Sequence, residues 1–108
     1  GSFPTWLAPV QVRVLPVTSA HEAHVAGLIA QLGAEGFRVD SAVADEQLGK
    51  RIRAAKLERI PYVLVVGDDD VQVNSVGVNP RGGEVQRNVS FDQFVERLRA
   101  DVHEGSGR

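Results

Sequence analysis

The sequence predicts an α/β domain, in which a mixed five-stranded sheet is flanked by three helices. Segments typical of strands and segments with helical apolar spacing alternate along the first two-thirds of the chain. Two further strand segments then follow each other through a Pro-Arg-Gly-Gly turn, before a last helical segment. Strands joined through helices pair in parallel and strands joined by a tight turn pair antiparallel, so the sheet is expected to be mixed.

The first part of the chain predicts a strand, a helix and a second strand. Residues 10–17 alternate and then become wholly apolar, as in a strand that enters a core. A helix is expected to begin near Ser19 and to end at Gly36, with apolar residues at helical spacing. Residues 37–43 alternate between apolar and polar side chains and predict the second strand.

A second helix is expected from about Glu46 to Arg59, before Pro61. Its apolar residues share one side, so its five basic residues are predicted to face outward: Lys50, Arg51, Arg53, Lys56 and Arg59. The run 62–66 that follows is continuously apolar, which is typical of a central strand covered on both faces.

The last third predicts a hairpin and a helix. An acidic turn at 67–70 leads to strands at 75–78 and 84–89, and residues 90–102 have the apolar stripe of a helix. Residues 104–108 are expected to form a flexible tail. At 108 residues, the chain is interpreted as a single domain, 1–108.

The composition is that of an ordinary globular protein, with 43% apolar and 24% charged residues. No apolar run approaches the roughly 18 residues of a membrane span, so no membrane partner is expected. The chain has no cysteine, which excludes disulfides and thiolate metal sites and favours a cytoplasmic location. The absence of an initial Met indicates a fragment, and Gly1-Ser2 is consistent with a cloning scar.

No catalytic or metal site is predicted. His21 and His24 lie three residues apart, but no motif adds a third ligand, and they are interpreted as exposed surface histidines. Asp68–Asp70 begins a segment that lacks the glycine and the closing glutamate of a calcium loop, which favours a solvated turn. The glycines match neither dinucleotide-binding nor P-loop spacing.

The basic face of the second helix has two interpretations, because the chain as a whole has a net charge of −2. It is either a solvated face or an RNA-binding surface. The helix lies next to the carboxyl ends of parallel strands, where such sheets usually bind ligands. Its cations would there contact phosphates, and Arg53 or nearby loop residues would reach the edges of unstacked bases.

Three segments resemble the anticodon-binding domain of threonyl-tRNA synthetases. The opening Phe-Pro-Thr-Trp-Leu-Ala-Pro-Val-Gln-Val of residues 3–12 resembles the start of that domain, and residues 48–53 and 60–68 follow at the family's spacing. The similarity runs from about Phe3 to Val102. The prolyl, histidyl and glycyl enzymes share the fold of this domain, the class IIa synthetase anticodon-binding fold, but not that opening.

The resemblance implies a module that binds tRNA and has no reaction centre of its own. The parent would be a homodimeric class II synthetase that threonylates threonine tRNA, and this chain would bind the anticodon arm. ATP and zinc would belong to a catalytic domain that this chain does not include, so the chain itself is expected to hold no cofactor.

The resemblance also implies the contacts with RNA. It places Asp45, Arg53, Asp70 and Asn79 near the bases, and Lys50, Arg51 and Arg81 at phosphates. The chain departs from the family at Ala44-Asp45, usually Arg-Asn, at Asp70, usually Glu, and at Asn79-Pro80, usually Arg-Thr. Fewer bidentate donors and more carboxylates are expected to weaken RNA binding or to change its geometry.

Two alternatives remain from other classes of protein. A free-standing paralogue that acts in protein–protein interaction, without binding RNA, would also account for the altered residues and the acidic balance. An independent small enzyme is disfavoured, because no catalytic constellation can be assembled from the sequence.

Overall fold

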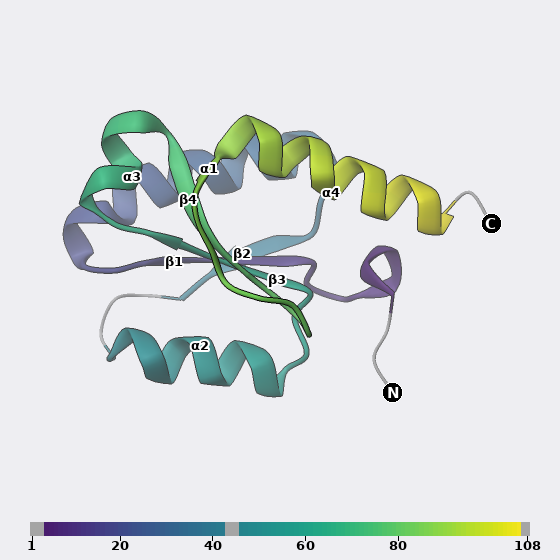
Figure 1. Ribbon diagram of the computed structural model, residues 1–108, viewed down its shortest axis with the longest axis horizontal. Coiled ribbons are helices and arrows are strands. Elements are labelled where there is room, and N and C mark those ends of the chain that lie inside the picture. The colour runs from purple at the N-terminus through teal and green to yellow at the C-terminus, as the bar shows by residue number, and fades with distance from the viewer. Residues whose placement is uncertain (1–3, 43–45, 107–108) are drawn as a thin grey trace.

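Helices cover both faces of a five-stranded sheet in the computed structural model, which describes residues 4–42 and 46–106 (Figure 1). Helices α1 (Glu22–Ala34) and α4 (Phe91–Ser106) pack on one face, and α2 (Leu48–Leu57) packs on the other. The predicted fold class is therefore confirmed.

The sheet has the order β2-β1-β3-β4-β5 and is mixed, as predicted. Strand β1 is parallel to both β2 and β3, whereas β3 to β4 and β4 to β5 are antiparallel. Strands β3, β4 and β5 are therefore consecutive in the sequence and are also neighbours in the sheet. The strand bounds are β1 Val12–Pro16, β2 Val39–Ser41, β3 Tyr62–Val66, β4 Ser75–Pro80 and β5 Gln86–Ser90.

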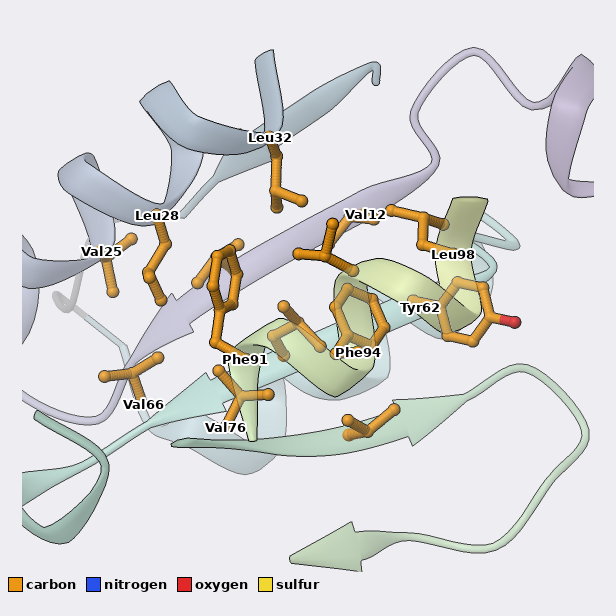
Figure 2. Packing of buried hydrophobic residues seen from close by; sticks show 14 residues of the cluster. Val12, Val25, Leu28, Leu32, Tyr62, Val66, Val76, Phe91, Phe94 and Leu98 are labelled. Carbon is orange, nitrogen blue, oxygen red and sulfur yellow. The ribbon is translucent and has the colours of Figure 1, made fainter. Parts of the chain in front are cut away.

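The larger core lies between the sheet and helices α1 and α4 (Figure 2). Phe91 and Phe94 from α4 are about 1% exposed, and the ring of Phe94 meets the ring of Tyr62 edge-on, with centroids 5.4 Å apart. The Tyr62 hydroxyl points out of this cluster, where it donates to Asp101 Oδ2 at 2.9 Å (Figure 2). Edge-to-face ring pairs add to the apolar burial that holds α4 on the sheet.

A smaller core lies on the opposite face, beneath α2. Its buried residues are Leu15 of β1, Ala55 of α2, Val63 of β3 and Ile60, which precedes β3. Leu48 and Ile52 pack against them. Strand β3 is therefore apolar on both faces, as its continuous apolar run predicted. Because this cluster is built on β1 and β3, α2 leaves the same face of β4 and β5 uncovered.

The predicted acidic turn is a short helix, α3 (Asp68–Val73). Asp70 stabilises its start, since Oδ2 accepts a hydrogen bond from the Gly67 amide at 2.9 Å and Oδ1 accepts one from Ser75 Oγ at 2.7 Å. Aspartates in a first helical turn also interact favourably with the helix dipole. Asn74, with a positive φ of 54°, ends the helix.

Helix α4 extends to Ser106, beyond residue 102 where the predicted helical stripe ends, and the flexibility of residues 104–108 stays a prediction. Residues 107–108 lie outside the described part of the chain. No helix within residues 4–42 and 46–106 is long and apolar enough to cross a membrane.

Candidate nucleic-acid interface

A groove of about 650 Å³ runs over the part of the sheet that α2 leaves uncovered. Its floor is formed by Val65 and Gly77, and one wall is formed by Leu48 and Ile52 of α2. The remaining lining residues come from the start of α3, from β4 and from β5: Gly67, Asp68, Asp69, Asp70, Asn79, Val85, Arg87 and Asn88. An apolar floor with polar groups along its sides suits a flat, partly polar ligand.

Two of the predicted site residues, Asp70 and Asn79, lie together in this groove. Both are partly exposed. The Asp70 carboxylate already accepts hydrogen bonds from Gly67 and Ser75, so it has a structural role at the start of α3 as well. The structure brings these two residues to one site, and their contact with RNA stays a prediction.

Arg53 and Lys50 lie on the exposed surface of α2. Neither residue lines the groove; Arg53 directly follows Ile52 of the groove wall and is turned about 100° from it around the helix axis. Lys50 lies about 200° from Ile52 around the axis, on the side of the helix that faces away from the groove. Arg53 is therefore the nearer of the two to the groove wall, and its contact with RNA stays a prediction.

Arg51 does not face outward, and that prediction is wrong. Its side chain is buried, at 5% exposure, and its guanidinium donates to the backbone oxygens of Pro16 at 2.6 Å and Val17 at 3.3 Å. Nε donates to the Glu46 oxygen at 3.1 Å. The guanidinium satisfies carbonyl groups at the end of β1, and buried carbonyls need such partners. A phosphate cannot reach it.

The spacing of α2 could have predicted this burial. Arg51 lies four residues before Ala55, which is fully buried, so both are on the same side of the helix.

Arg81 lies near the start of β3, whereas α3 follows the end of that strand. Its amide donates to the Pro61 oxygen at 2.8 Å, and Nη1 donates to the Arg59 oxygen at 3.0 Å. It lines a smaller, polar pocket with Tyr62, Arg97 and others, and it does not line the groove. Asp45, together with Ala44, lies outside the described residues.

Arg87 was missed by the sequence analysis. It lies on β5, it is exposed, and it lines the groove opposite α3. The alternation of strand 84–89 would have placed it on the same face as Val85, but nothing in that pattern shows that this face is uncovered.

The two histidines are not exposed, contrary to the prediction. His21 is 5% exposed, its Nδ1 accepts a hydrogen bond from the Thr18 amide at 3.2 Å, and its Nε2 lies 2.6 Å from Asp68 Oδ1. His24 is partly buried, and its Nε2 has no hydrogen-bond partner among the described residues. No group of three metal-binding side chains occurs in the described ranges.

Residues 11–101 match the family model described as "Anticodon binding domain". A threonine-tRNA ligase of Nitratidesulfovibrio vulgaris (strain DP4) is 46% identical over 104 residues, which cover 96% of this chain and 16% of that protein. A threonine-tRNA ligase of Geobacillus sp. (strain WCH70) is 44% identical over 103 residues, which cover 94% of this chain and 16% of that protein. The chain thus spans about one-sixth of the length of these relatives.

Two solved structures share the fold. The RNA binding domain of threonyl-tRNA synthetase from Cryptosporidium parvum Iowa II superposes with a TM-score of 0.86 at 23% identity, covering 94% of this chain and 26% of that chain. Prolyl-tRNA synthetase from Cryptosporidium parvum gives a TM-score of 0.80 at 19% identity, covering 95% and 22%. The chain therefore belongs to the anticodon-binding domain family, and its resemblance to the threonyl-tRNA synthetase domain is confirmed.

Proposed function

We propose that this domain binds the anticodon arm of threonine tRNA in the groove between α2, α3 and β5. The observation that supports this function is the groove itself, in which polar side chains of three elements surround an apolar floor. The names of the relatives indicate the tRNA, since they are threonine-tRNA ligases.

The groove has the chemistry that an unstacked base requires. A base presents two apolar faces and an edge of hydrogen-bond donors and acceptors, and RNA-binding proteins recognise it by contacting both. Ile52, Val65 and Val85 offer apolar surface. Asn79 offers an amide that can both donate and accept, while the aspartates of α3 can only accept. Donor-rich base edges would therefore be favoured on the side of α3.

The outer surface of α2 offers cations for the phosphates next to the bound bases. Arg53 and Lys56 are exposed on this helix, on the side towards β4. Contacts with phosphates fix the position of a nucleic acid, and contacts with bases provide specificity. Arg53 directly follows Ile52 of the groove wall, and we propose that its long side chain takes part in one of these contacts.

The longer protein is proposed to be a cytoplasmic, homodimeric threonine-tRNA ligase. Its catalytic domain would hold ATP and zinc and would threonylate the tRNA that this domain positions. We assign no catalytic residue and no cofactor to the present chain.

Binding is tested by fluorescence-anisotropy titration of a labelled threonine anticodon stem-loop at low salt, with a scrambled loop as the control. The proposal predicts saturable binding that is weaker for the scrambled loop, and a further loss in Asn79→Ala for the threonine loop only. Equal affinity for both loops, or no binding, would contradict it. The protein-interaction alternative would then be favoured, and it would be pursued by measuring binding to the remainder of the parent protein.

A further inference from the structure

Strand β5 contains a β-bulge opposite Gly77 of β4. Val76 pairs with Val89, and Val78 pairs with Gln86. Gly77 of β4 therefore lies opposite two residues of β5, Arg87 and Asn88. Asn88 has a positive φ of 56°, in the left-handed region. A bulge of this kind adds one residue to a strand and redirects the side chains around it.

The bulge brings Arg87 and Asn88 to the same face of the sheet. In a regular strand, neighbouring residues point to opposite faces. Here Gln86 accepts a hydrogen bond from Arg97 of α4 at 2.8 Å, and Val89 packs against the larger core, so both lie on the α4 side. The two residues between them, Arg87 and Asn88, both line the groove on the opposite side.

The walls of the groove at α3 and at β5 carry opposite charges. Asp68–Asp70 line the wall at α3, and Arg87 lines the wall at β5. The guanidinium of Arg87 is exposed and forms no hydrogen bond or ion pair with the described residues. Carboxylates repel phosphates, whereas a guanidinium binds them through charge-assisted hydrogen bonds. The backbone of an RNA strand is therefore favoured along β5 and disfavoured along α3.

We propose that Arg87 contacts a backbone phosphate of the RNA strand that enters the groove, and that the bulge at Arg87 and Asn88 positions it for this contact. The inference rests on the proposed function. It adds a phosphate contact at β5 to those proposed at α2, with the bases over the apolar floor towards Asn79 and α3.

The test is a titration of the 108-residue chain with the threonine anticodon stem-loop at several salt concentrations. Arg87→Gln is expected to weaken binding about tenfold at low salt. It should also reduce the slope of log affinity against log salt by about 0.7, the value for one phosphate of a single strand. Arg97→Gln makes the same charge change on the α4 face and is expected to leave affinity and slope unchanged. Arg87→Lys should keep the slope.

A second pair of variants tests the bulge without changing any charge. Asn88→Val places a β-branched residue at a positive φ, which it rarely adopts, and is expected to weaken binding by a similar factor. Asn88→Gly keeps that backbone geometry accessible and should bind like the wild type. Urea unfolding of both variants shows whether each is folded under the conditions of the titration, and Arg87→Gln tests the phosphate contact independently of the bulge.

Three outcomes would overturn the inference. If the wild type binds and Arg87→Gln matches it in affinity and slope, the contact is absent and the proposed function stands. If Arg87→Gln keeps the slope but no longer distinguishes the scrambled loop, Arg87 contacts a base and the phosphate assignment is wrong. If the wild type binds neither loop, the proposed function and this inference fail together.

Discussion

Arg51 Nη1 lies 2.6 Å from the carbonyl oxygen of Pro16, so a buried guanidinium joins helix α2 to the end of strand β1. This contact fixes the start of α2 at the end of the sheet where α3 also begins (Figure 1). The position of the groove wall at Leu48 and Ile52 therefore depends on a residue that does not line the groove.

Arg51→Ala is expected to lower the free energy of unfolding by about 2–4 kcal/mol, because it removes the guanidinium from the buried carbonyl of Pro16 and from the partly buried carbonyls of Val17 and Glu46. Urea unfolding measures the change. Lys50→Ala is the matched control: it removes the neighbouring, exposed cation and should change the free energy by no more than about 0.5 kcal/mol. Similar losses in both variants would show that the Arg51 contacts do not stabilise the fold.

Asp70→Ala is expected to cost about 1–2 kcal/mol of stability, because its carboxylate accepts hydrogen bonds from the Gly67 amide and from Ser75 Oγ. Asp69→Ala removes an exposed carboxylate of the same first turn and should cost much less. Thermal unfolding of the two variants makes the comparison. A larger loss in Asp69→Ala would contradict the capping role of Asp70.

The free energy of unfolding is expected to fall at high pH, because Tyr62 then loses its phenol proton. Burial, followed by the hydrogen bond to Asp101, raises the pKa of Tyr62 above its ordinary value. The folded state therefore holds the phenol proton more tightly than the unfolded state. The resulting stability is fully present below about pH 10, the ordinary pKa of tyrosine, and is lost as the pH rises through the raised pKa.

The titration of Tyr62 can be observed directly, because it is the one tyrosine in the sequence. Ultraviolet absorbance of tyrosinate should give a midpoint above 10 in the folded chain and an ordinary midpoint in denaturant. Urea unfolding of Tyr62→Phe should show a smaller loss of stability between pH 9 and about pH 11 than the wild type. Equal midpoints in the folded and denatured chain would refute the raised pKa.

Arg53→Ala is expected to weaken binding of the threonine anticodon stem-loop more than Lys56→Ala. Arg53 follows Ile52 of the groove wall directly, whereas Lys56 lies one turn farther along α2, away from Leu48. Each variant removes one exposed cation from the same helix, so their net charges match. Equal losses in a titration at one salt concentration would place both cations outside the site, as part of a general electrostatic attraction.

The fold could be predicted from periodicity, because its helices and strands bury continuous apolar stripes. Helix α2 contains the residue whose orientation was predicted wrongly. Five basic residues in one short segment suggest a solvated face, but Arg51 shares the buried side of the helix with Ala55. Charge composition gave the wrong orientation for Arg51, and residue spacing gives the right one.

Two local features had no reliable sequence signal. The aspartates of α3 are poor residues for a helix interior and suggest a turn, yet a first turn favours them, and Asp70 accepts the bonds that stabilise it. The bulge at Arg87 and Asn88 depends on pairing with β4, which a period of two residues cannot reveal. The sequence therefore did not predict the part of the groove that β5 forms.

An NMR titration of the labelled chain with the threonine anticodon stem-loop at low salt tests most directly whether tRNA binds in the groove. A scrambled loop serves as the control. Saturable shifts that cluster at Arg53, Asp70, Asn79 and Arg87, and that weaken with the scrambled loop, are the predicted result. Shifts confined to α1 and α4, on the opposite face of the sheet, or identical shifts with both loops, would contradict the assignment.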